Sequence, residues 1–118
     1  MKFLMTYQQN PNLPPPTEDK MKAIGELTVR NMKSGKLVMT GGLVRPQNGI
    51  QVKCVKGKFS HTDGPFAETK ELIDGFALVD VGSKEEALAM CAEFMGIAGD
   101  GAGELLQVFD MGEGQPAK

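Results

Sequence analysis

Apolar residues fall in short runs along the chain, separated by turns rich in glycine and proline. Four of these runs have strand length and predict four strands, at 2–8 (KFLMTYQ), 36–43 (KLVMTGGL), 75–81 (GFALVDV) and 104–110 (ELLQVFD). A further pair of segments, 50–55 and 58–62, flanks the tight turn Lys56-Gly57, and apolar and polar residues alternate in the first of them. A period of two about a two-residue turn predicts a hairpin.

Two other segments have helical spacing. Thr17 stands where an N-cap belongs and is followed by Glu18 and Asp19, which the helix dipole favours in a first turn. The second helix begins with the capping box Ser83 to Glu86. The apolar stripes expected to face the core are Met21, Ile24, Leu27 and Met32 in the first helix and Ala87, Leu88, Cys91, Phe94, Met95 and Ala98 in the second. The glycine-rich stretch 96–103 is expected to be a loop.

The predicted order is strand, helix, strand, hairpin, strand, helix, strand. Two βαβ halves joined by a hairpin predict an α+β fold, a ferredoxin-like sandwich whose antiparallel sheet carries both helices on one face. We expect one domain over residues 1–110 and a flexible tail over 111–118. The strands carry more apolar side chains than two helices can cover: Phe3, Met5, Leu37, Met39, Phe76, Leu78, Leu105 and Val108. Such a surplus predicts a homodimer that associates sheet to sheet.

Composition excludes several classes of protein. Hydrophobic residues make up 41% and charged residues 24% of the 118 residues, and the net charge is −2, which is typical of a globular domain without a basic surface. We therefore expect no nucleic acid partner. The apolar runs are too short for a membrane span, and MKFLMTY turns polar too early for a signal peptide, so a cytoplasmic location is expected.

The cysteines and the histidine argue against a metal site. Cys54 and Cys91 are far apart and the chain has a single histidine, so neither a zinc site nor another metal or organic cofactor is expected. Both thiols are expected to be reduced and buried.

The stretch HTDGPFAETKE, residues 61–71, carries the densest set of chemical groups. Asp63 and Glu68 are candidates for an acid/base pair. His61 is a further catalytic candidate, because it stands two residues before Asp63, on the same side of an extended strand, where the two side chains are expected to make contact. Phe66 is a candidate for stacking on a planar ligand, and Lys70 for binding an anionic group. The alternative is structural: Asp63 caps a tight Gly-Pro turn by accepting backbone hydrogen bonds, and the charges that follow are solvated.

Residues outside this stretch complete the candidate site. Tyr7, the sole tyrosine, stands at the end of the first strand as a phenolic hydrogen-bond donor. Gly41 and Gly42 lack side chains, so a ligand could approach their backbone closely.

The run DGPFAETKE resembles the motif of the DGPF-domain, YCII-related proteins. The segments MKFLMTY, GKLVMTGGL and GFALVDVGSKEEAL follow in the order of that family, so the resemblance covers about residues 1–110. It implies a dimeric α+β barrel with a cleft between each sheet and its helices or loops. Relatives that look enzymatic pair an aspartate with a histidine in the first helix, whereas residues 17–34 of this chain contain no histidine.

Two functions follow from the resemblance and the loop together. The first is binding of a small molecule near Asp63 and Phe66. In its enzymatic form, the protein would also convert that molecule to product without a cofactor. The second is a non-catalytic ligand-binding or regulatory role, since some family members are encoded beside extracytoplasmic-function sigma factors. A scaffold without any ligand is the third alternative.

Overall fold

The computed structural model describes residues 1–10, 12–43, 49–64, 73–109 and 111. The elements follow the predicted order: β1 (Lys2–Gln9), α1 (Glu18–Lys33), β2 (Leu37–Gly42), β3 (Ile50–Val55), β4 (Lys58–Asp63), β5 (Gly75–Asp80), α2 (Lys84–Ala98) and β6 (Gly101–Val108). Among the described residues, no helix is both long enough and apolar enough to cross a membrane.

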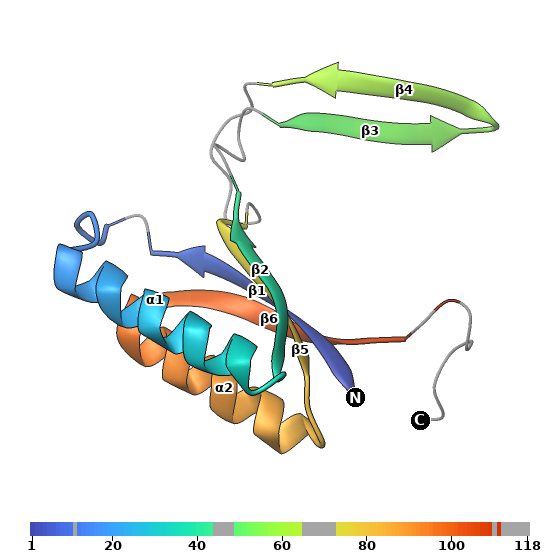
Figure 1. Cartoon of the computed structure of the whole chain (residues 1–118). Helices are drawn as coiled ribbons and strands as arrows, with labels where there is room; N and C mark the ends of the chain where they lie inside the picture. Colours follow the sequence, from blue (N-terminus) through green and yellow to red (C-terminus); the bar gives the residue numbers. More distant parts are fainter. Residues whose placement is uncertain (11, 44–48, 65–72, 110, 112–118) are drawn as a thin grey trace.

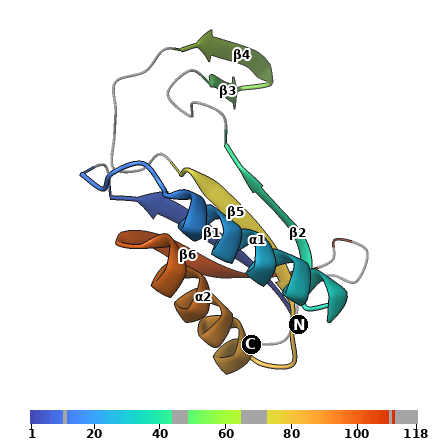
Figure 2. The ribbon, with the colours of Figure 1, turned by 60° about the vertical axis from the view of Figure 1, so that its left-hand side comes forward.

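The main sheet has four strands in the order β2-β5-β1-β6, and every neighbouring pair is antiparallel. Both helices lie side by side on one face of this sheet (Figure 1), and the rotated view shows the same layering (Figure 2). The strand order places β5 between β1 and β2, as a split βαβ unit requires. The predicted α+β, ferredoxin-like fold is confirmed.

The helix ends form for the predicted reasons. The Thr17 hydroxyl accepts a hydrogen bond from the Lys20 backbone N–H at 3.1 Å, and Ser83 does the same for Glu86 at 3.1 Å. Each bond satisfies one N–H group that the first helical turn leaves without a partner. Gly35 follows α1 with a φ of 79°, the left-handed conformation in which glycine is least strained.

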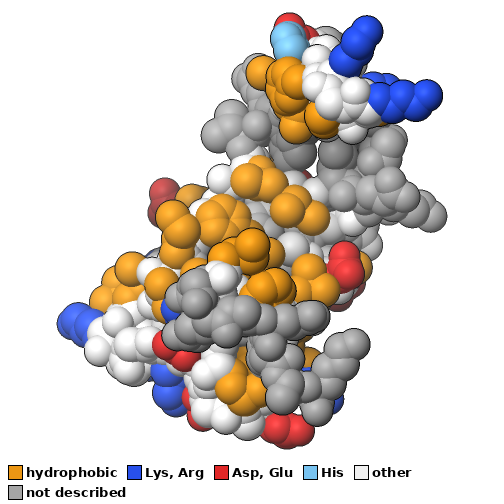
Figure 3. Space-filling view, turned by 90° about the vertical axis from the view of Figure 1, so that its right-hand side faces the viewer, with side chains coloured by type: hydrophobic (Ala, Val, Ile, Leu, Met, Phe, Trp, Pro, Cys, Tyr) orange, Lys and Arg blue, Asp and Glu red, His pale blue; other side chains and the backbone are white. Residues whose placement is uncertain are grey.

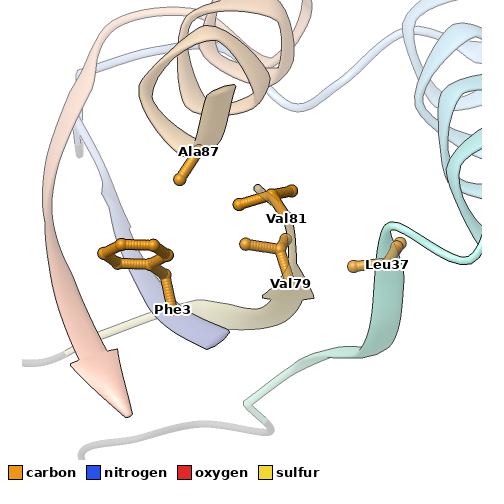
Figure 4. Close-up of a cluster of buried hydrophobic side chains, with 5 residues drawn as sticks. All are labelled: Phe3, Leu37, Val79, Val81 and Ala87. Atoms are coloured by element: carbon orange, nitrogen blue, oxygen red, sulfur yellow. The ribbon is translucent and has the colours of Figure 1, made fainter. Parts of the chain in front are cut away.

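The core lies between α2 and the middle of the sheet. Phe3, Val79 and Val81 point toward Ala87 of α2, and Leu37 packs beside them from β2 (Figure 4). Each of these side chains is at most 8% exposed. At about 25 cal/mol per Å² of apolar surface, this cluster is a main source of the free energy that fixes α2 on the sheet.

The opposite face of the sheet is apolar, and neither helix covers it (Figure 1). Leu4 of β1 stands between Leu78 of β5 and Leu106 of β6 in the register, and Met39 lies opposite Leu78 on the other side. Met39 is 57% exposed and Leu106 47% exposed. Figure 3 shows hydrophobic side chains gathered over this face. We call Leu4, Met39, Leu78 and Leu106 the outer face.

The helical stripes differ from the prediction in three positions. Met21 and Met32 of α1 and Leu88 of α2 were expected to face the core, but they are 61%, 50% and 49% exposed. The core side of α1 carries Thr28 and Asn31 beside Ile24 and Leu27 instead, since those four positions follow the i, i+3, i+4, i+7 spacing of one helix face. The prediction failed because it followed hydrophobicity rather than the exact helical period.

The stretch 96–103 is not the loop that was expected. α2 continues to Ala98, and β6 begins at Gly101, three residues before the predicted start. Gly101, Ala102 and Gly103 pair with Gln9, Gln8 and Tyr7 of β1. A Cβ atom at Gly103 would overlap the Thr6 carbonyl oxygen, so the glycine permits this close pairing rather than breaking the strand.

The predicted hairpin is confirmed, and β3 and β4 extend away from the main sheet (Figure 1). All twelve residues of the two strands are exposed. Cys54 lies among them, so the prediction of a buried thiol is wrong at this position. Cys54 does lie on the same side of β3 as Ile50 and Val52, as the alternation of apolar and polar residues predicted. It is exposed because no described element covers that side of the hairpin. Cys91 is half-buried, and both thiols are free.

Candidate functional site

A cavity of about 370 Å³ lies between the two helices and the sheet. Its wall is mostly apolar, and the contributing side chains come from β1, α1, β2, β5 and α2. Representative members are Met5, Leu27, Ala77, Met90 and Phe94. The volume is in the range that proteins use for compact ligands, and a mostly apolar wall with few polar groups is typical of such sites.

Small residues line the cavity where β2 ends and β5 begins, beside Tyr7 of β1. Gly41, Gly42 and Gly75 line this end together with Asp74. The Asp74 carboxylate accepts a hydrogen bond from the Gln9 backbone N–H at 2.7 Å, and the Asp74 backbone N–H donates to the Tyr7 carbonyl at 2.8 Å. Asp74 is therefore fixed at the point where three strands meet.

Tyr7 closes part of the cavity from β1. It is 8% exposed, and its ring meets the Phe94 ring edge to face at a centroid distance of 5.2 Å. The hydroxyl donates to the carbonyl oxygens of Gly99 and Asp100, at 3.1 and 3.3 Å. Burial, and secondarily the negative charges of Asp74 and Asp100, raises the pKa of the Tyr7 phenol above its ordinary value. The Tyr7 hydroxyl is thus a neutral group that already donates to the protein, and the raised pKa makes it a weak acid.

Polar groups also reach the cavity from α1. Thr28 and Asn31 line it on the face of the helix that carries Ile24 and Leu27. The Thr28 hydroxyl donates to the Ile24 carbonyl at 2.8 Å, so its hydrogen-bonding capacity is used within the helix. The hydrogen bonds of the described residues include none from the Asn31 side-chain amide.

Cys91 of α2 lines the same cavity. Burial raises the pKa of its thiol, and the backbone hydrogen bond that lowers it is the smaller effect. A thiol with a raised pKa carries little thiolate at neutral pH and is a poor nucleophile. Cys91 is therefore a weak candidate for a nucleophile.

Comparison with known proteins identifies the relatives of this fold. The YCII-related domain matches residues 1–112. The chain belongs to the YCII-related family. An uncharacterized protein of Rhizobium meliloti (strain 1021) is 35% identical over 71 residues, which are 60% of this chain and 57% of that protein. The chain thus matches little more than half of the relative's length.

Of the residues predicted from the sequence, three lie at the cavity of this YCII-related protein. Tyr7, Gly41 and Gly42 line it. Gly41 leaves room for the Phe76 ring, because a Cβ atom at position 41 would come within 3.3 Å of that ring. Gly42 is less crowded: its nearest neighbour, the Asp74 carbonyl oxygen, would be 3.7 Å from a Cβ atom.

His61 and Asp63 lie elsewhere, on β4 of the hairpin. The predicted contact between them forms, with His61 Nδ1 3.4 Å from Asp63 Oδ1, but their side chains are 57% and 70% exposed. Neither is among the described residues that line the cavity. Phe66, Glu68 and Lys70 fall within residues 65–72, outside the described part of the chain.

Asp74 and Asn31 were not predicted. Asp74 precedes Gly75 and has the sequence appearance of an ordinary turn aspartate, while Asn31 looks like a surface residue near a helix end. The available signal was the period of α1, since Asn31 stands seven residues after Ile24 and so on the same face. Over the described residues, no group of three or more His, Cys, Asp or Glu side chains gathers that could hold a metal ion.

Proposed function

We propose that this YCII-related protein binds a small, mostly apolar molecule in the cavity between its helices and its sheet. The observation that carries the proposal is the cavity itself, a mostly apolar hollow of about 370 Å³ that lies between the helices and the sheet and is partly open to solvent. A hollow of this volume with a few polar groups on an apolar wall is the usual form of a small-molecule site.

The position of the family motif supports the same site. The DGPFAETKE run ends at Glu71, and Asp74 at the cavity follows three residues later. Asp74 is held by Gln9 and Tyr7, so the chain leaves the motif at a fixed point on the cavity wall. Phe66 is proposed to contact the ligand from this segment.

An NMR titration with a panel of neutral aromatic compounds tests the proposal. Binding should shift the backbone amide signals of Leu27, Ala77 and Met90, which come from three walls of the cavity. The variant Thr28→Phe places a ring in the cavity and should abolish these shifts. Val29→Phe adds the same ring at the adjacent position, which is 52% exposed, and should leave them unchanged. The proposal fails if no compound shifts these signals, or if Thr28→Phe leaves the shifts as they are.

Binding without turnover is the form of this function that the geometry favours. The hydroxyl groups of Tyr7 and Thr28 already donate to carbonyl oxygens, and the thiol of Cys91 has a raised pKa. A non-catalytic ligand-binding or regulatory protein, of the kind associated with sigma-factor-linked regulation, needs no more than this.

A cofactor-free enzyme is the second candidate, and the 3.4 Å contact between His61 and Asp63 is what favours it. A histidine beside a carboxylate is a common general base, and Glu68 is proposed as the second proton carrier. Turnover of a substrate panel, lost in Asp63→Asn and retained in Asp80→Asn, would support catalysis. No turnover by the wild-type protein, or turnover that survives Asp63→Asn, would leave the binding function alone.

Association into a homodimer through the outer face is proposed as the arrangement in which this cavity works. An exposed apolar surface on a sheet usually marks an interface. The outer face spans the whole sheet, because each of its four strands contributes one of the four side chains.

A further inference from the structure

Asn31 is a polar residue of the cavity wall whose side chain forms no hydrogen bond with the described residues. It is half-buried and lies on the core side of α1, one turn beyond Leu27, which is 7% exposed. Its side-chain amide offers two donors and an acceptor. Among the described residues, no side-chain or backbone group forms a hydrogen bond with that amide, although its backbone carbonyl accepts bonds from Ser34 and Lys36.

The Asn31 amide is not sealed from water, since no side-chain nitrogen or oxygen among the described residues is both buried and without a hydrogen-bond partner. A ligand that fills the cavity would displace this water, and the amide would then need a hydrogen bond from the ligand in its place. Asparagine is a weaker helix former than leucine. Thr28, one turn earlier, shows the usual solution, since its hydroxyl bonds back to Ile24 within the helix.

The charges of the wall restrict which molecule could use this amide. Among the described residues that line the cavity, Asp74 is the one charged side chain, and neither lysine nor arginine is present. An anionic ligand would lose its hydration without gaining a counter-charge, and would be repelled by Asp74. The remaining wall favours a ligand that makes apolar contacts and carries one group able to hydrogen-bond to an amide.

We propose that Asn31 is the hydrogen-bonding anchor of the cavity, and that the ligand is an uncharged, mostly apolar molecule bearing a carbonyl or carboxamide group. The proposal rests on the proposed function, because it assigns the recognition chemistry of the same cavity. The amide N–H of Asn31 donates to the ligand carbonyl, and the Asn31 carbonyl accepts a ligand N–H where there is one. The rest of the ligand fills the apolar space between Leu27, Ala77 and Phe94.

Three naphthalene compounds that share an apolar body test this assignment. Naphthalene-2-carboxamide has the proposed polar group, 2-methylnaphthalene lacks it, and 2-naphthoate replaces it with a negative charge. Their fluorescence reports binding directly because the protein contains no tryptophan. The wild-type protein should bind the carboxamide about three- to tenfold more tightly than the hydrocarbon, as one net hydrogen bond allows. The naphthoate should bind about tenfold or more weakly than the carboxamide.

Substitutions at Asn31 separate recognition from folding. Asn31→Leu should abolish the advantage of the carboxamide over the hydrocarbon and should raise the urea midpoint of unfolding. Asn31→Ala removes the amide without adding volume and should abolish the same advantage. Glu26→Leu adds a leucine to the exposed side of the same helix and should leave the ratio of the two affinities unchanged.

The outcomes distinguish this inference from the function on which it rests. If none of the three compounds binds in the cavity, both are overturned. If the hydrocarbon and the carboxamide bind equally well, or if both Asn31 variants keep the carboxamide advantage, only the assignment of Asn31 is overturned. A naphthoate that binds as tightly as the carboxamide would contradict the uncharged ligand class.

Discussion

Tyr7 is the sole tyrosine, so its ionisation can be followed by absorbance without interference from another tyrosine. Burial and the nearby carboxylates raise the pKa of the folded phenol above the ordinary value of 10.0. We expect the 295 nm titration of the native protein to lie at higher pH than that of the protein in urea. The stability that this group contributes is full below pH 10.0 and is lost as the pH rises through the folded pKa. Coincident titration curves would contradict the buried, hydrogen-bonded environment.

The two thiols should differ in reactivity. Cys54 is exposed on the hairpin, whereas Cys91 is half-buried at the cavity and its pKa is raised by burial. A thiol reagent at neutral pH should therefore label one site rapidly and the other slowly. Cys54→Ser should remove the rapid phase and Cys91→Ser the slow phase. If Cys91 supplied the rapid phase, the packing of α2 against the cavity would be different from that described.

The sequence predicted some residues of the cavity wall and missed others. Tyr7 stood out because it is unique and ends a strand, and it does lie at the cavity. Asn31 did not stand out, because a polar residue in a helix is expected on the solvent side unless the helix faces something other than a packed core. The contact of His61 with Asp63 was predictable from their spacing, since i and i+2 share a face in a strand.

At the scale of the elements, substituting alanine for Gly103 or for Gly25 should change the free energy of unfolding in opposite directions. Gly103 of β6 pairs with Tyr7, and an added Cβ atom would overlap the Thr6 carbonyl. Gly103→Ala should lower the free energy of unfolding by about 1–3 kcal/mol or more. Gly25 lies inside α1 with no atom within 4 Å of an added Cβ, so Gly25→Ala should raise it by about 1 kcal/mol.

Urea denaturation of the two alanine variants, alongside the parent, gives both values. Equal effects, or a stabilising Gly103→Ala, would show that β6 does not pair closely with β1 at this end. A destabilising Gly25→Ala would show that α1 is in contact with something on that side.

Elements were predicted from the sequence where the physics is local. Caps such as Thr17 and Ser83 depend on a few neighbouring residues, and both form as expected. The start of β6 was missed because glycines normally interrupt strands, whereas here Gly101 and Gly103 accommodate β1. That requirement arises from a strand more than ninety residues away and cannot be read from the glycines alone.

At the scale of the whole molecule, the apolar outer face, which neither helix covers, predicts association. Met39→Glu introduces a charge into the outer face at a position 57% exposed, and it should weaken or abolish the dimer. Met21→Glu makes the same change on α1 at a position 61% exposed and should not. Light scattering at micromolar concentration measures both. A monomeric wild-type protein, or equal behaviour of the two variants, would contradict association through this face.

The overall fold was predictable because the order of strands and helices allows few topologies. The cavity was not, because its volume depends on how far α1 stands from the sheet, which no periodicity encodes. The separation of His61 and Asp63 from the cavity was likewise unpredictable, since it depends on the direction in which the hairpin leaves the sheet (Figure 1).

The central claim is that the cavity between the helices and the sheet is a ligand site, and a crystal structure of the protein with naphthalene-2-carboxamide tests it most directly. We predict that the compound lies between Tyr7 and Asn31, with its carboxamide within hydrogen-bond distance of the Asn31 side chain. A compound bound on the outer face or on the hairpin, with the cavity closed by side chains, would contradict the claim.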